Sequence, residues 1–170
     1  MRWNNLLCRM FMFQWPDRQG WRFSVFCLLA FCGLALPFGL WTGLYSWAPT
    51  PLSWSLIGFA LYLFVIPAVL EEVVFRGPLL WWQARKESVP VWLIVVSLSL
   101  FIVWHPANTY VFMPEARDLF SDWRFLTVAG ALGCVATLLA LRTRSLWPPI
   151  VFHWLVVVGW KALFGAPDFV

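Results

Sequence analysis

The sequence predicts an all-α membrane protein, a polytopic bundle of about five transmembrane helices. Of its 170 residues, 62% are hydrophobic and 12% are charged, whereas soluble domains have about 45–50% apolar and about 25% charged residues. The mean hydropathy of the chain is +0.76. The 14 tryptophans are typical of membrane–water interfaces, where the indole ring is apolar and its N–H still finds a partner.

This composition excludes several classes of protein. A soluble globule of this length buries only about 70% of its surface, and the rest would need roughly twice the charge present here. A soluble enzyme, a disordered chain and a nucleic-acid-binding domain are therefore excluded, although the net charge is +4. A single membrane-embedded domain, residues 1–170, is expected at this length, with the lipid bilayer as its surroundings.

Each predicted helix is an apolar run long enough to cross a hydrocarbon core of about 30 Å, which takes about 20 residues. Five runs qualify: residues 21–47, 51–82, 89–105 with a weaker extension to 113, 123–141 and 146–164. The second is unusually long, and Gly77-Pro78 could divide it into a tilted span and a surface helix. A cleaved signal peptide is the alternative for the first, but no small-x-small site follows it.

The basic residues predict a cytoplasmic N-terminus. With that orientation, three of the twelve Lys and Arg residues lie outside, namely Arg117, Arg124 and Lys161. The other nine lie inside: Arg2, Arg9, Arg18, Arg22, Arg76, Arg85, Lys86, Arg142 and Arg144. Cytoplasmic loops carry such an excess of positive charge.

Five ionisable residues stand well inside the spans, where a charge costs about 2.5–3.5 kcal/mol, whereas Lys161 is near the end of the last span and can snorkel. They are Glu71, Glu72 and Arg76 on the second span, His105 on the third and His153 on the fifth, and the histidines are the only two in the chain. Glu72 and Arg76 are four residues apart, so a helix places them on one face, where they can pair. Glu71 is turned about 100° away and is left to face another helix.

An unpaired carboxylate in an apolar site suits a general base near neutral pH. Imidazoles from two other helices can orient a water and stabilise an oxyanion. Such a set suffices for peptide-bond hydrolysis without a covalent intermediate. The purely structural alternatives are a capping glutamate pair, a basic anchor at Arg76 and histidines that hydrogen-bond between helices.

Three segments resemble the motifs of a known family. Residues 71–76, Glu-Glu-Val-Val-Phe-Arg, resemble the EExxxR motif of the CPBP family, the CAAX-processing and bacteriocin-processing membrane proteins formerly grouped with the Abi proteins. Residues 101–105, Phe-Ile-Val-Trp-His, resemble its FxxxH motif. Residues 146–153, Leu-Trp-Pro-Pro-Ile-Val-Phe-His, resemble the lead-in to its last motif. The resemblance covers a core of residues 69–157.

The resemblance implies a glutamate-dependent intramembrane endopeptidase that needs no cofactor. By analogy with the family, Glu71 activates a water together with His105, and His153 helps to form the oxyanion hole. Glu72 and Arg76 are then the supporting ion pair.

One position departs from the family pattern. The family usually has Asn or Asp four residues after the last histidine, but here Val157 stands there and can neither donate nor accept a hydrogen bond. Asn108 and Lys161 are candidates for the missing donor. Removing one oxyanion donor typically costs about 10²–10³ in rate.

The two histidines are also expected at different depths. With a rise of about 1.5 Å per residue, straight helices leave a gap of about 10 Å between His105 and His153. Tilt, a later start of the third span or a broken helix lining a wet cavity would close it.

The short five-span form is similar to small family members paired with C-terminal sorting tails, such as JDVT-type signals. This likeness implies a membrane-anchored protein substrate with a C-terminal hydrophobic tail, and the inner membrane of a bacterium. Two alternatives remain. One is a catalytically weak membrane scaffold or bacteriocin-immunity protein. The other is a metal-dependent hydrolase with Glu71, His105 and His153 as zinc ligands.

Overall fold

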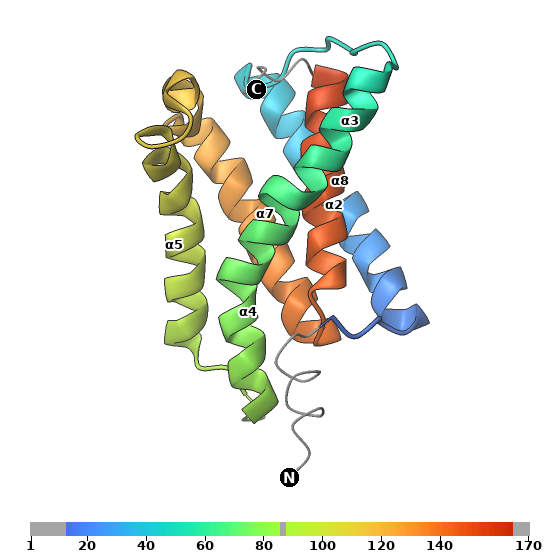
Figure 1. Ribbon diagram of the computed structural model, residues 1–170, viewed down its shortest axis with the longest axis vertical. Coiled ribbons are helices and arrows are strands. Elements are labelled where there is room, and N and C mark those ends of the chain that lie inside the picture. The colour runs from blue at the N-terminus through green and yellow to red at the C-terminus, as the bar shows by residue number, and fades with distance from the viewer. Residues whose placement is uncertain (1–12, 86–87, 165–170) are drawn as a thin grey trace.

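The protein is a bundle of helices (Figure 1). The computed structural model describes residues 13–85 and 88–164, and in these residues no β-strand is found beyond one isolated bridge between Ala48 and Phe164. Five helical segments are long and apolar enough to cross a membrane, so the predicted fold class and span count are confirmed. They are α2 (Arg18–Thr42), the segment Trp54–Arg85, α5 (Val91–Thr109), α7 (Trp123–Thr143) and α8 (Trp147–Phe164).

The long second span is one segment with an internal break. It comprises α3 (Trp54–Leu63), the π-helical turn η1 (Phe64–Val69) and α4 (Leu70–Arg85). Within η1, Ile66 has non-helical angles of φ −127° and ψ 111°, because the residue before a proline is pushed out of the helical region. The break therefore lies at Ile66-Pro67 and not at Gly77-Pro78, which α4 carries within its helix.

Polar side chains mark where the helices begin. Asp17 accepts a hydrogen bond from the backbone N–H of Gly20 at 2.7 Å, and Ser53 accepts one from Leu56 at 3.2 Å. Such caps satisfy backbone donors that the first helical turn leaves free. At the other end of α2, Gly43 takes the left-handed conformation with φ 72°. The first span therefore ends at Thr42, five residues before the predicted boundary at residue 47.

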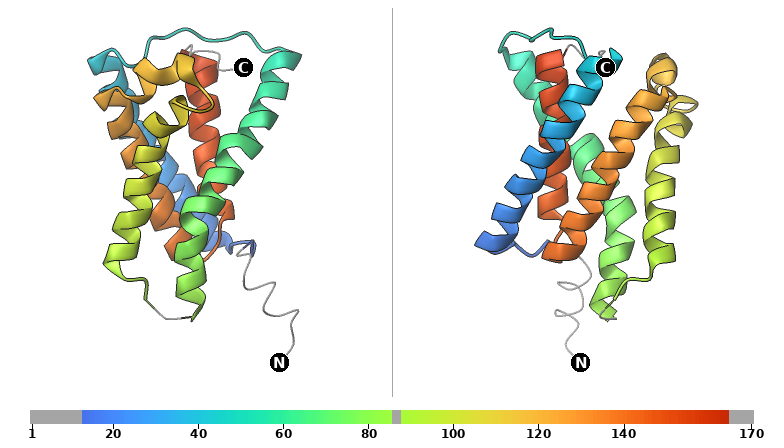
Figure 2. Two further views of the ribbon diagram at one scale, coloured as in Figure 1. Left: turned by 60° about the vertical axis from the view of Figure 1, so that its left-hand side comes forward. Right: turned by 180° about the vertical axis from the view of Figure 1, so that it is seen from behind.

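α7 lies at the centre of the bundle and packs against α2, α4, α5 and α8. Small residues on its buried faces, Ala129, Gly133, Ala136 and Ala140, allow this close approach. Between α5 and α7 the chain forms two short helices, η2 (Pro114–Ala116) and α6 (Arg117–Phe120). Figure 2 shows α3 leaning outward at the end of the bundle away from α4.

A polar contact ties α7 to the end of α2. Arg124 donates to Asp122 and, from Nη1, to the carbonyl of Thr42 at 2.8 Å. The hydrogen bonds from Arg124 hold the pKa of Asp122 below its ordinary value, so this capping carboxylate stays ionised. Asp122 also accepts the backbone N–H of Arg124 at 2.8 Å.

One basic residue that the predicted orientation counted on the inner side does not lie at a span end. Arg76 was counted among the inner basic residues, but its side chain is fully buried within the bundle. It is therefore not a loop anchor, because it pairs inside the protein instead of facing the lipid headgroups. Of the predicted inner residues, Arg2, Arg9 and Lys86 lie outside the described residues. The orientation itself stays a prediction.

We expect Gly39→Ala to lower the free energy of unfolding by about 1–3 kcal/mol, because overpacking forces neighbouring groups to shift. Gly39 is buried in α2, and the Tyr45 ring lies directly over it, in the space that a Cβ would take. Gly33 of the same helix has open space at that position. Gly33→Ala is the matched control and should gain up to about 1 kcal/mol. Unfolding in mixed detergent micelles measures both, and equal stability of the two variants would contradict the packing at Gly39.

Candidate active site

The two glutamates lie in the first turn of α4, directly after the break in η1. Acidic side chains are favourable in a first helical turn, where the helix dipole is positive. Glu71 is 7% exposed and Glu72 is fully buried. Two carboxylates thus lie inside the bundle, where each needs partners.

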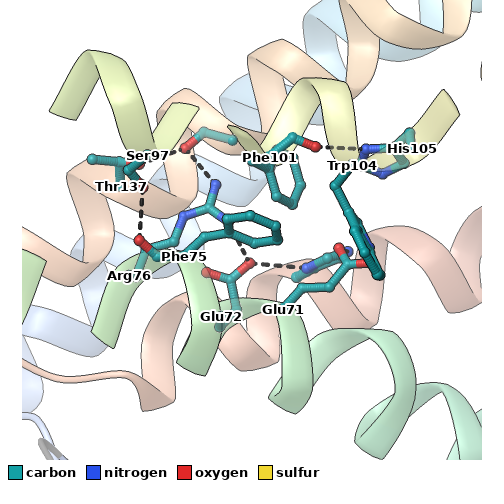
Figure 3. Close-up of polar contacts among 11 residues, drawn as sticks. Glu71, Glu72, Phe75, Arg76, Ser97, Phe101, Trp104, His105 and Thr137 are labelled. Carbon is teal, nitrogen blue, oxygen red and sulfur yellow. Dashed lines mark hydrogen bonds and ion pairs between the residues drawn. The ribbon is translucent and has the colours of Figure 1, made fainter. Parts of the chain in front are cut away.

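Glu72 forms the ion pair predicted from its spacing. Arg76 Nη1 lies 3.3 Å from Glu72 Oε1, and both side chains are fully buried. Arg76 also donates from Nη2 to the carbonyl of Gly133 on α7 at 3.0 Å, and its guanidinium lies 4.2 Å from the centre of the Phe101 ring. Figure 3 shows this cluster between α4, α5 and α7. The arginine is therefore held by three helices.

His153 of α8 reaches both glutamates. Its Nδ1 lies 2.9 Å from Glu72 Oε1, and its Nε2 lies 4.0 Å from Glu71 Oε2. Because a carboxylate only accepts hydrogen bonds, Nδ1 is the donor, and this contact orients the ring. Nε2 is left as the atom that faces Glu71.

Glu71 has a partner that the sequence reasoning missed. Trp104 of α5 donates from Nε1 to Glu71 Oε1 at 3.1 Å. The other carboxylate oxygen, Oε2, is buried without a hydrogen-bond partner. The signal available in the sequence was the position of Trp104 next to His105 in the second motif, but an aromatic residue there also reads as simple packing.

His105 lies in the same buried region, surrounded by aromatic rings. It is 9% exposed, and its Nδ1 lies 2.9 Å from the carbonyl of Phe101. Its ring centre is 5.0 Å from that of Phe101, 5.4 Å from Phe125 and 5.7 Å from Phe120. Phe101 also packs against His153, at 6.1 Å. Phe101 is one turn, about 6 Å, before His105 on α5, and its ring contacts both imidazoles.

The structure thus brings together four of the five predicted site residues by direct polar contact: Glu71, Glu72, Arg76 and His153. His105 joins them through the Phe101 ring. Within residues 13–85 and 88–164, no group of three His, Cys, Asp or Glu side chains is arranged to hold a metal ion. The three-ligand zinc site considered from the sequence is therefore not formed by these residues.

Residues 52–159 match the family described as Type II CAAX prenyl endopeptidase Rce1-like. The chain belongs to this family. The match covers well over half of the 170 residues and includes all five predicted site residues. No curated protein and no solved structure matches the chain.

Family membership confirms the coarser part of the resemblance. The family is one of CAAX endopeptidases, which are intramembrane glutamate-dependent proteases. The described residues of the chain form five candidate membrane spans, so the chain is an integral membrane protein of this family.

Within this family member, the two candidates for the donor missing at Val157 make other contacts. Asn108 donates from Nδ2 to Met113 Sδ at 3.7 Å, and the Lys161 ammonium lies 5.4 Å from the centre of the Phe59 ring. Neither contact involves Glu71 or His153. The neutral donor that does reach Glu71 is Trp104.

Proposed function

We propose that the chain is a glutamate-dependent intramembrane endopeptidase that removes C-terminal membrane-anchoring or sorting tails from partner proteins. The observation that carries this proposal is the free oxygen of Glu71. Glu71 Oε2 is buried without a hydrogen-bond partner and lies 4.0 Å from His153 Nε2. A gap of this size between polar atoms is one that a single water can bridge.

In the proposed reaction, Glu71 is the general base. It takes a proton from the water at Oε2 while the water oxygen forms a bond to the carbonyl carbon of the scissile peptide. The proton held by Glu71 then passes to the leaving nitrogen as the C–N bond breaks. The products are a new carboxyl terminus and a free amine, which together contain all the atoms of the water. No covalent enzyme intermediate forms.

The histidines have separate roles in this proposal. Glu72 accepts the His153 Nδ1–H and so orients the ring, and in this proposal an N–H on Nε2 donates to the developing oxyanion. His105 donates from Nδ1 to the Phe101 carbonyl, so its Nε2 is the nitrogen able to contact the water. Arg76 neutralises Glu72.

The family description, a CAAX prenyl endopeptidase, supports a protein substrate. For this chain we infer a membrane-anchored protein with a C-terminal hydrophobic tail. We infer that this tail is a JDVT-type sorting signal. We infer the inner membrane of a bacterium as its location.

A reconstituted cleavage assay tests this function. The purified protein in liposomes receives a reporter with a C-terminal tail made of a short motif, an apolar helix and a basic end. A second reporter carries a prenylated CAAX tail, and a third carries the same apolar helix at its N-terminus. We expect mass spectrometry to find a new C-terminus in the first reporter and none in the third. If only the prenylated reporter is cleaved, the substrate is the prenylated CAAX tail and not the sorting tail.

A membrane scaffold or immunity protein is the second candidate, and Val157 favours it because that position lacks the polar residue usual in the family. A scaffold would bind the first reporter in the bilayer without generating a new C-terminus. Co-purification with an intact tail and no product would therefore overturn the protease and support the scaffold.

A further inference from the structure

The indole of Trp104 connects α5 to the proposed catalytic base on α4. Its ring is half-buried, and its Nε1–H donates to Glu71 Oε1 at 3.1 Å across 33 positions of sequence. Figure 3 shows the Trp104 ring lying next to Glu71, on the side away from Arg76. One carboxylate oxygen of Glu71 is therefore held by a neutral donor.

Holding one oxygen sets the direction of the other, because a carboxylate is planar and rigid. With Oε1 held by Trp104, Oε2 lies 4.0 Å from His153 Nε2 and is buried without a hydrogen-bond partner. A glutamate without this contact would be free to rotate about its terminal bond, whose rotamer preference is broad. The indole N–H thus selects the orientation in which Oε2 faces His153.

The backbone that carries Trp104 is itself fixed against α4. Ser97, two turns earlier on α5, donates from Oγ to the carbonyl of Phe75 on α4 at 2.7 Å. The Phe101 ring packs between these helices against Phe75, at 5.4 Å between ring centres. A donor mounted on a rigid helix pair can hold a carboxylate more closely than one on a loop.

We propose that Trp104 is a positioning residue that aims the free oxygen of Glu71 at the water site beside His153. This inference rests on the proposed function, in which Glu71 is the general base. The hydrogen-bond donor that orients Glu71 is then on α5, whereas residue 157 on α8 is a valine and cannot donate. The role is carried by the N–H group and not by the size of the ring.

Replacing Trp104 with 3-benzothienyl-L-alanine tests this role, because the analogue keeps the ring shape and has sulfur in place of N–H. We expect kcat to fall about 10- to 100-fold with KM unchanged within about twofold, since misplacing a reacting group by about 1 Å costs on the order of 10² in rate. 5-Fluorotryptophan at the same position keeps the N–H and should retain activity. The benzothienyl analogue at Trp92, an exposed position on the same helix, is the matched control.

A second readout does not depend on proteolysis. Dicyclohexylcarbodiimide, an apolar reagent, forms a covalent adduct with buried carboxyl groups, and mass spectrometry gives the rate of labelling at Glu71. We expect this rate to rise several-fold with the benzothienyl analogue at 104, because Oε1 loses its donor. It should stay unchanged with the analogue at 92.

The two readouts separate the failure of the inference from the failure of the function. If the wild-type protein cleaves its reporter and the benzothienyl protein at 104 matches it in kcat and in labelling, the positioning role is wrong and the protease stands. If the wild-type protein cleaves nothing, the proposed function is wrong. The labelling rate then still shows whether Trp104 holds Glu71.

Discussion

Glu71→Gln is expected to lower kcat for reporter cleavage by about 10²–10⁴-fold, the contribution typical of a positioned general base. The glutamine side chain has the same shape and can still accept the Trp104 N–H at Oε1, but it cannot take a proton from water. The substitution also removes a buried carboxylate without creating a cavity, so the protein should fold and insert as before. Cleavage rates in liposomes and the free energy of unfolding in micelles measure the two expectations.

Glu115→Gln provides the matched control for this prediction. Glu115 is an exposed glutamate in η2, between α5 and α7. The same chemical change there should leave kcat within about twofold of wild type, since surface substitutions have small effects. Full cleavage by Glu71→Gln would show that another group activates the water. Loss of cleavage with loss of folding would instead give Glu71 a structural role.

Arg76→Met is expected to lower the free energy of unfolding by about 3–5 kcal/mol, because removing one partner of a buried ion pair leaves the other charge uncompensated. Arg76 is fully buried and contacts Glu72 and the Gly133 carbonyl. Its loss leaves Glu72 with His153 alone. Reversible unfolding in mixed detergent micelles is the measurement.

Two further variants isolate the charge effect at Arg76. Arg85→Met changes an exposed arginine at the end of the same helix, where it stacks on Trp81, and should cost about 1 kcal/mol or less. The double variant Glu72→Gln with Arg76→Met removes both charges, and should be more stable than Arg76→Met alone. If Arg76→Met and Arg85→Met lose equal stability, the buried pair does not hold the bundle together.

The features that could be predicted from the sequence are those governed by neighbours along the chain. An apolar run of about 20 residues crosses a bilayer whatever lies beside it, so the five spans followed from composition. The pairing of Glu72 with Arg76 followed from helical geometry, because residues four apart share one face. The break in the second span shows the limit of local rules. Both Pro67 and Pro78 were able to end a helix, and only the first disturbs it.

The partners of these residues across the bundle could not be read from the chain. Trp104 and Glu71 are 33 positions apart, and His153 and Glu72 are 81 apart. Many residues on each apolar helix could face the same neighbour, because helix rotation and tilt are set by packing and not by hydropathy. From the sequence Arg76 can be either a basic anchor or the partner of Glu72, and its hydrogen bond to the Gly133 carbonyl of α7 decides that the guanidinium lies inside the bundle.

The sequence by itself therefore predicted a membrane bundle of about five spans, with the candidate site residues on three of them, because a charge inside hydrocarbon is costly and marks a position with a special role. Only the tertiary structure decided which of those residues meet. It joined His153 to both glutamates, left one oxygen of Glu71 free and placed Trp104 against the other. The physical reason is that the small residues of α7 let the helices approach closely, and side chains far apart in sequence come within hydrogen-bond distance only at such contacts.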